Sequence, residues 1–258
     1  MIIAITREVS PAMVNCELTH FSRQPIDIEL AYRQHQAYED ALKTLGCQVQ
    51  RMPADPELPG SVFVEDAAVV LDEVAIITRP GAISRRPETA SIASALKPYR
   101  QLYTIEAPGT VDGGDVLCIG KNIYVGLSTR SNMHAIEQMQ DILSPHGYVV
   151  LGIPVSGCLH LKSAVTLLSK ETLLINPAWV DATIFGDMQV LEVDPLEPYG
   201  ANVLWIGEGA IYPANFPRTR QRVEEAMKKL GIGLSMVDVS ELQKAEGAVT
   251  CCSLILRS

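Results

Sequence analysis

The chain has 258 residues, of which 47% are hydrophobic and 20% are charged, a composition typical of a water-soluble globular protein. Its formal net charge is −9 and its basic residues are dispersed, which argues against nucleic acid as a partner because phosphate binding requires a basic face. The first apolar run is too short for a signal peptide, and no stretch approaches the roughly 18 apolar residues of a membrane span. We therefore expect no membrane partner and a cytoplasmic location, where the six cysteines stay reduced.

One hairpin pattern recurs along the chain. A polar residue opens an apolar run, a tight polar turn follows, and a second apolar run ends near Arg, Pro or Asn. Copies of this pattern open at about residues 64, 112, 160, 202 and 251, and the last copy contains only its first strand. Stretches with helical periodicity, such as 131–143 and 219–230, lie between the hairpins.

The two ends of the chain each carry a strand without a partner, one at 2–6 and one after the last polar opening. We expect these two strands to pair and to close a five-fold ring in a single domain, 1–258, because short radial strands leave only small edges. An ordinary layered α/β sheet is the alternative. The copies are 49, 48, 39 and 50 residues apart when they are aligned on Asp66, Asp115, Ser163, Asn202 and Cys252.

Ring closure would bring the residues that open the repeats to one axis. Taken singly, each has a structural explanation: a turn, a satisfied core histidine, a solvated strand end, or small apolar residues at a strand start. Their recurrence at equivalent positions favours a catalytic site instead. The converging residues are Glu65, Asp66, Asp112, Asp115, His160, Cys251 and Cys252.

A thiolate beside a histidine is the general arrangement for covalent catalysis. Carboxylates near a thiol raise its pKa, so an anionic pocket is poorly suited to a neutral ester and better suited to a planar cation. Two carboxylates can hold a guanidinium by charge-assisted hydrogen bonds, and the bound cation then favours the thiolate. The histidine would protonate the departing amine and then activate water. Adjacent cysteines do not supply the spaced thiolates of a zinc site, so no metal is expected.

Six motifs stand in order along the chain. They are Phe-Val-Glu-Asp at 63–66, Arg-Pro-Gly-Ala-x-Ser-Arg-Arg at 79–86, Asp-Gly-Gly-Asp-Val-Leu at 112–117, Val-Gly-Leu-Ser-x-Arg-x-Asn at 125–132, His-Leu-Lys-Ser at 160–163 and Thr-Cys-Cys-Ser at 250–253. Together they resemble the dimethylarginine dimethylaminohydrolase family, a member of the guanidino-modifying (pentein) superfamily. The likeness also takes in 33–36 and 58–59 and so runs over most of the chain. It implies an α/β fold, the five-bladed α/β propeller (pentein fold) of pseudo-five-fold ββαβ repeats.

The resemblance implies hydrolysis of Nω,Nω-dimethyl-L-arginine and Nω-methyl-L-arginine to L-citrulline and the methylated amine, through a covalent cysteine thiouronium. It implies no cofactor and no metal, and it leaves a homodimer open. The nucleophile falls on Cys251, the general acid/base on His160, and the carboxylate paired with that histidine on Asp112. The substrate-binding positions fall on Asp66, Glu65, Arg85, Arg130, Leu18 and Ala245, with Leu18 in a segment that resembles the family's flexible lid.

The chain departs from the family pattern at Gly60, where the relatives carry an aspartate six residues before Asp66. Because glycine has no side chain to bind substrate, the guanidine that this chain accepts can differ. Arginine deimination or amidino transfer is therefore the alternative activity. A guanidino-compound binding protein, or a redox sensor built on Cys251 and Cys252, is the alternative without turnover.

Overall fold

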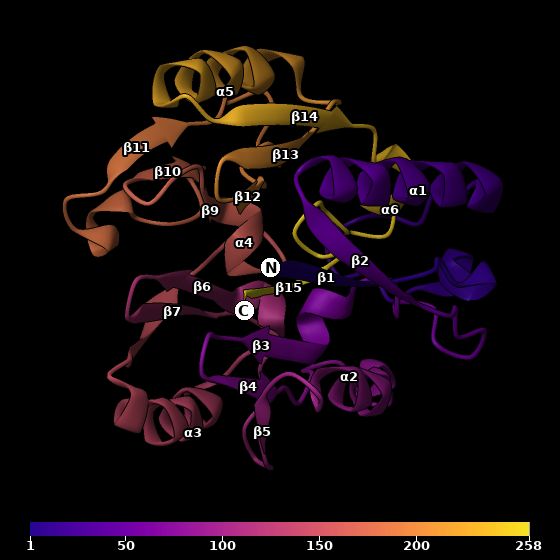
Figure 1. Cartoon of the computed structure of the whole chain (residues 1–258), viewed down its shortest axis with the longest axis vertical. Coiled ribbons are helices and arrows are strands. Elements are labelled where there is room, and N and C mark those ends of the chain that lie inside the picture. The colour runs from indigo at the N-terminus through magenta and orange to yellow at the C-terminus, as the bar shows by residue number, and fades with distance from the viewer. Residues whose placement is uncertain (258) are drawn as a thin grey trace.

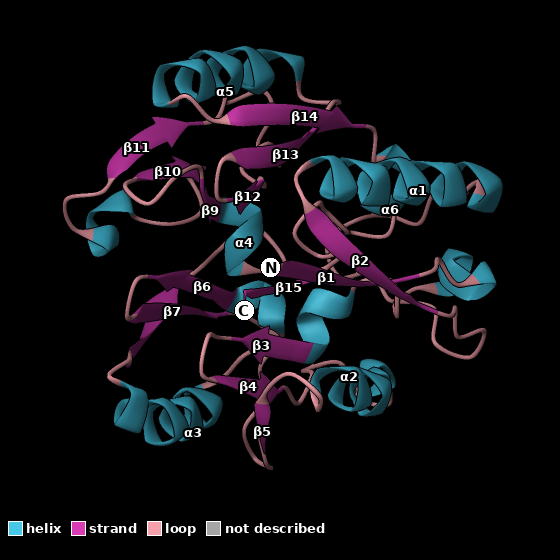
Figure 2. Cartoon of the chain, viewed as in Figure 1, coloured by secondary structure: helices cyan, strands magenta, loops and turns pink. Residues whose placement is uncertain are grey.

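A computed structural model describes residues 1–257 and shows an α/β architecture with five three-stranded sheets. The sheets surround the centre of the molecule in Figure 1, and the longer helices lie toward the periphery in Figure 2. In every sheet the central strand pairs with one antiparallel and one parallel neighbour. The repeated ββαβ organisation expected from the hairpin pattern is thus present.

The strands are short, as the repeat predicts. In sheet order they are β15 (Leu254–Arg257), β1 (Ile2–Arg7) and β2 (Cys47–Met52); β3 (Ala68–Val70), β4 (Val74–Ile77) and β5 (Gln101–Thr104); β6 (Val116–Ile119), β7 (Asn122–Leu127) and β8 (Val149–Pro154); β9 (Val165–Leu167), β10 (Thr172–Ile175) and β11 (Gln189–Glu192); β12 (Leu204–Ile206), β13 (Gly209–Pro213) and β14 (Gly233–Val237).

The two ends of the chain share one sheet. Strand β1 pairs antiparallel with β15, with Ile2 opposite Arg257 and Ile5 opposite Leu254. The prediction that the first and last strands pair is confirmed. In Figure 1 the N and C labels lie together near the centre of the view, beside β1 and β15. This pairing places the loop that carries Cys251 next to the first strand of the chain.

A helix joins the second and third strands of four sheets. These helices are α1 (Ile28–Thr44), α2 (Glu88–Leu96), α3 (Met133–Leu143) and α5 (Pro217–Leu230). In the sheet of β9, β10 and β11, the connection contains only the short 3₁₀ helix η6 (Ala182–Phe185). The absence of a long helix there explains the 39-residue spacing between Ser163 and Asn202.

Local signals explain where the helices begin and end. The Asp27 side chain accepts a hydrogen bond from Leu30 N at 2.9 Å, which caps the start of α1. Asn132 caps α3 in the same way. Helix α5 begins at Pro217 and ends before Gly231, whose φ of +69° is readily adopted only by glycine. The remaining short helices are η1 (Pro11–Asn15), η2 (Val64–Ala67), η3 (Ile83–Arg85), η4 (Gly113–Asp115), α4 (Leu161–Ala164), η5 (Ser144–His146) and α6 (Ser240–Gln243).

The residues that open the first three repeats lie in or beside short helical turns rather than in strands. Asp66 is in η2, Asp115 is in η4, and His160 immediately precedes α4. In a 3₁₀ turn successive side chains point about 120° apart, so neighbours such as Glu65 and Asp66 face different directions. Because of this geometry, some of the predicted site residues line a common cavity and others point elsewhere.

The apolar core fills the space between the sheets and the helices. Helix α1 buries Tyr38 and Leu42 completely, and the Tyr38 hydroxyl lies 2.7 Å from the Ser253 hydroxyl. That contact joins α1 to the segment that contains Cys251. Within residues 1–257, no helix combines the length and the apolar character that crossing a membrane requires.

Candidate active site

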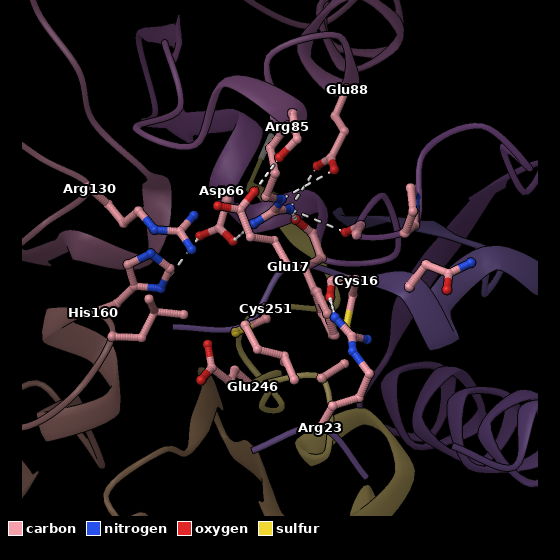
Figure 3. A pocket seen from close by; sticks show the side chains of 18 residues that line it. Cys16, Glu17, Arg23, Asp66, Arg85, Glu88, Arg130, His160, Glu246 and Cys251 are labelled. Atoms are coloured by element: carbon pink, nitrogen blue, oxygen red, sulfur yellow. Dashed lines mark hydrogen bonds and ion pairs between the residues drawn. The ribbon is translucent and has the colours of Figure 1, made fainter. Parts of the chain in front are cut away.

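A cavity of about 420 Å³ opens near the centre of the molecule. Figure 3 shows its side chains, with Cys251, His160, Asp66, Arg85 and Arg130 around one space. Leu18 and Ala245 also line it. Seven of the nine predicted site residues therefore border one cavity, although they come from segments spread over the whole chain. The other two are Asp112, which lies behind His160, and Glu65.

The two adjacent cysteines have different surroundings. Cys251 borders the cavity, whereas Cys252 is fully buried in the apolar cluster around α1 and its thiol lies 3.4 Å from the Ala248 carbonyl oxygen. Burial, and then the carboxylates of Glu65 and Asp66, raise the pKa of the Cys251 thiol. Next to these groups Cys251 is consequently a neutral thiol at neutral pH.

His160 is held between two carboxylates. Its Nε2 atom lies 3.0 Å from Asp112 Oδ2, and its Nδ1 atom lies 3.9 Å from Asp66 Oδ1. Burial opposes the charged imidazolium, but Asp66 and the hydrogen bond to Asp112 outweigh burial and raise the pKa of His160 to about 9. The histidine is therefore protonated at neutral pH and can donate a proton to a leaving group.

Asp112 is completely buried and is held by its neighbours. Its Oδ1 atom accepts a hydrogen bond from Gly81 N at 2.9 Å, and its Oδ2 atom lies 3.5 Å from Arg130 Nη1. These contacts hold the carboxylate next to His160. The family resemblance predicted this pairing of Asp112 with the histidine. Asp112 does not line the cavity itself, but it contacts His160 and Arg130, which do.

Among the carboxylates predicted for the site, Asp66 is the one that lines the cavity. Its Oδ1 atom accepts a hydrogen bond from Gly114 N at 3.0 Å, and its Oδ2 atom forms an ion pair with Arg85. Burial favours the neutral acid, but His160 and Arg85 lower the pKa of Asp66 to about 2. A Cβ atom on Gly114 would lie 2.6 Å from His160 Nδ1 and 2.8 Å from Asp66 Oδ1, so the Asp-Gly-Gly-Asp segment needs glycine here for close approach.

Arg85 contacts a second acid, Glu88. Its Nη2 atom donates to Glu88 Oε2 at 2.7 Å and its Nε atom to Glu88 Oε1 at 3.2 Å, a bidentate pair. A Cβ atom at Gly60 would lie 3.0 Å from Arg85 Nε and 3.1 Å from Glu88 Oε1. The Arg85–Glu88 pair thus packs against the position where the family's aspartate would begin.

Glu65, which was expected beside Asp66, does not border the cavity of Cys251. Its carboxylate forms an ion pair with Lys162 and accepts a hydrogen bond from the Thr250 hydroxyl at 2.9 Å. Thr250 immediately precedes Cys251, so Glu65 supports the loop of the cysteine. The turn geometry of η2 accounts for the different directions of Glu65 and Asp66.

The segment around Leu18 covers one side of the cavity. Thr19 Oγ1 accepts a hydrogen bond from Arg130 Nη2 at 2.9 Å, and the carboxylate of Glu246 accepts hydrogen bonds from backbone amides of the same segment. Several polar residues that line the cavity were not predicted from the sequence, and only Glu88 had a local signal, its i+3 spacing from Arg85 at a helix start. These residues are Asn15, Cys16, Glu17, Arg23, Ser84, Glu88 and Glu246.

One group of side chains has the composition of a cation site. Asp66, Asp112 and His160 offer ligand atoms within 4.8 Å of one another. However, both carboxylates already contact arginine guanidinium groups, and a metal needs the neutral form of an imidazole that is protonated up to about pH 9. The arrangement favours an organic cation that donates hydrogen bonds over a metal ion.

Comparison with known proteins places this site in a family. The family model described as "N,N dimethylarginine dimethylhydrolase, eukaryotic" matches residues 17–183, well over half of the chain. The chain belongs to the dimethylarginine dimethylaminohydrolase family. The resemblance seen in the six motifs is confirmed.

Two bacterial relatives of this family are similar over most of their length. The N(G),N(G)-dimethylarginine dimethylaminohydrolase of Pseudomonas aeruginosa is 39% identical over 230 residues, 88% of this chain and 89% of the relative. The protein of the same name from Streptomyces coelicolor is 39% identical over 264 residues, 98% of this chain and 96% of the relative.

Solved structures show the same architecture. A variant of the Pseudomonas aeruginosa enzyme in complex with citrulline has a TM-score of 0.92 at 37% identity and covers 98% of both chains. The N-terminal domain of a cyanobacterial arginine dihydrolase has a TM-score of 0.87 at 19% identity, with 99% of this chain and 97% of the other covered. The second likeness concerns the fold alone.

Proposed function

We propose that this family member hydrolyses Nω,Nω-dimethyl-L-arginine and Nω-methyl-L-arginine to L-citrulline and dimethylamine or methylamine. It would thus be a hydrolase acting on the C–N bonds of linear amidines. The observation that carries the proposal is the meeting of Cys251, His160 and Asp66 in one cavity, with Arg130 at its wall. The citrulline complex of a relative at 37% identity supports the product.

Cys251 is the proposed nucleophile. When the guanidinium binds, the thiol gives its proton to solvent water, because His160 is already protonated. The thiolate then adds to the guanidinium carbon and forms a tetrahedral adduct with a new C–S bond. The bond from carbon to the methylated nitrogen then breaks, and His160 gives its proton to the departing amine. Water, deprotonated by His160, adds to the resulting S-alkylthiouronium. Collapse of that second adduct releases citrulline and returns the thiol.

The substrate itself activates the thiol. Burial, together with Glu65 and Asp66, raises the pKa of Cys251 and keeps its thiol neutral. A guanidinium bound to Asp66 adds a positive charge next to the sulfur and favours the thiolate. This order of events confines the reactive thiolate to the complex with substrate.

Arg85 and Arg130 are the proposed ligands of the α-carboxylate of the substrate. Arginine suits this role because its planar fork matches a carboxylate. Arg85 is paired with Asp66, so a substrate guanidinium competes with Arg85 for that acid. Leu18 and Ala245 contribute the backbone at the amino-acid end, and Asp112 holds the imidazolium of His160.

We further infer that the five sheets are the blades of a closed propeller and that the whole chain forms one catalytic domain. The pairing of β1 with β15 supports this inference, because one sheet is completed only by both ends of the chain. Opening that sheet would release the loop of Cys251 from its neighbours.

Citrulline release from a panel of guanidines tests the proposed function. Purified, reduced protein should release citrulline from both methylated arginines faster than from arginine, and agmatine, which lacks the α-carboxylate, should yield no N-carbamoylputrescine. Gly60 is the specific reason to include arginine, because the aspartate of the relatives is missing where Arg85 and Glu88 meet. Faster turnover of arginine would establish a deiminase, and product formation only with an added amine would establish an amidinotransferase.

A further inference from the structure

We propose that Glu246 is a positioning residue that holds the lid closed over Cys251. The lid is defined here as residues 17–21, the segment around Leu18. Its role in turnover depends on the proposed function, whereas the contact between Glu246 and the lid does not. Glu246 has no role among the residues that the family resemblance assigns.

The carboxylate of Glu246 binds three successive backbone amides of the lid. Oε2 accepts a hydrogen bond from Thr19 N at 2.9 Å, and Oε1 accepts hydrogen bonds from His20 N and from Phe21 N, the latter at 2.7 Å. Consecutive amides that point toward one anion form a concave binding site, and hydrogen bonds to a charged acceptor are stronger than neutral ones. One side chain thus fixes the backbone of three lid residues.

The backbone at Glu246 has an unusual conformation that directs this side chain. Its φ is +61°, and within residues 1–257 it is the only residue other than glycine with positive φ. Hydrogen bonds on both sides maintain it, from Glu246 N to Gln243 O at 2.9 Å and from Gly247 N to Leu242 O at 3.0 Å. The next residue is also constrained, because a Cβ atom on Gly247 would lie 2.1 Å from the ring of Phe63.

The position of Glu246 links the lid to the catalytic loop. Ala245 and Cys251, one residue before it and five after it, both border the cavity, as does Glu246 itself. Figure 3 shows Glu246 near Cys251 at the edge of the cavity. The residue that holds the lid therefore belongs to the same segment of the chain as the nucleophile.

Three other side-chain contacts also hold the lid. Thr19 Oγ1 accepts a hydrogen bond from Arg130, Glu17 accepts one from Ser84, and the Phe21 ring packs edge-on against Tyr199 with centroids 4.9 Å apart. All of these are single side-chain contacts. Within residues 1–257, Glu246 is the only residue whose side chain is seen to bind backbone amides of the lid, and Thr19 and His20, which donate two of these bonds, are exposed.

Hydrogen exchange of the lid amides tests this proposal without any turnover. In the unliganded protein, Glu246→Gln should raise the exchange rate of the Thr19 amide at least tenfold, because an amide NH₂ cannot accept from Thr19 N, whereas its carbonyl oxygen can still accept from His20 N and Phe21 N. Glu246→Gly removes both acceptors, so it should raise the exchange rates of all three amides of 19–21 at least tenfold while relieving the positive φ. Glu208→Gln, a loss of one exposed charge at a distant turn, is the matched control and should leave the lid rates unchanged.

Kinetics with whichever guanidine the protein turns over provide the second readout. Glu246→Gln should raise KM about tenfold and change kcat less than threefold, and Glu246→Asp should recover part of the loss. Unchanged lid exchange in both Glu246→Gln and Glu246→Gly would overturn the proposal, whether or not the protein hydrolyses methylated arginines. Equal acceleration of exchange in the lid and throughout α1 would also overturn it, because that result indicates general destabilisation.

Discussion

The carboxylates around the cavity act on both groups that perform the proposed chemistry. They raise the pKa of His160 to about 9 and also raise the pKa of Cys251, for which burial is the largest cause. The cavity therefore holds a neutral thiol and an imidazolium rather than a thiolate–imidazolium pair. A proton donor is ready before substrate arrives, whereas the nucleophile is formed only when a cation is bound.

Asp66, through its charge, and Asp112, through its hydrogen bond, outweigh burial and hold the proton on His160. A raised pKa of about 9 means that the proton is present below that pH and is lost as the pH rises through it. We expect kcat to fall with a midpoint near pH 9, because the leaving amine then lacks its proton donor. Asp112→Asn should move this alkaline limb to lower pH, toward the ordinary value of about 6.5.

The pH–rate profiles of the wild-type protein and of Asp112→Asn, together with an NMR titration of His160 in both, measure this shift. The exposed Asp187→Asn serves as the control for loss of a distant charge. An alkaline limb and a His160 titration that both stay in place in Asp112→Asn would contradict the role given to Asp112.

Among the elements, helix α1 connects the apolar core to the catalytic loop. Leu42 and Tyr38 are completely buried on its inner face, and Tyr38 contacts Ser253, two residues after the nucleophile. Leu42→Ala should lower the free energy of unfolding by about 2–5 kcal/mol, because the buried methyl groups are lost and a cavity remains.

Denaturant unfolding monitored by circular dichroism measures that loss. The neighbouring Lys43→Ala, at an exposed position on the same helix, should change the free energy of unfolding by less than about 0.5 kcal/mol. Equal effects of the two substitutions would show that α1 does not pack as described.

The short turns that open the repeats are the elements that sequence patterns predict least well. A three- or four-residue helix such as η2 has no periodicity to detect, so the apolar runs indicated strands where the chain first makes a turn. The difference matters for function, because the turn directs Asp66 into the cavity and Glu65 toward Lys162. The expectation that Glu65 binds substrate beside Asp66 came from the family resemblance and from their adjacency in the sequence.

At the scale of the whole molecule, the repeat spacing predicted the pairing of β1 with β15, since each end held a strand that needed a partner. It also predicted that Cys251, His160 and Asp66 would come together. The contacts of Glu246 with the lid were beyond prediction, because they join backbone amides to a side chain more than 220 residues away in the sequence. Such contacts depend on the folded path of the main chain and leave no residue pattern.

The mass of the protein during turnover tests the central claim most directly. Protein mixed with Nω,Nω-dimethyl-L-arginine and quenched in acid should gain the mass of the substrate less that of dimethylamine, localised by peptide mapping to Cys251. Cys252→Ser should retain the adduct, because Cys252 is buried away from the cavity, and Cys251→Ser should show none. Citrulline release without an adduct on Cys251, or undiminished turnover by Cys251→Ser, would contradict the proposed mechanism.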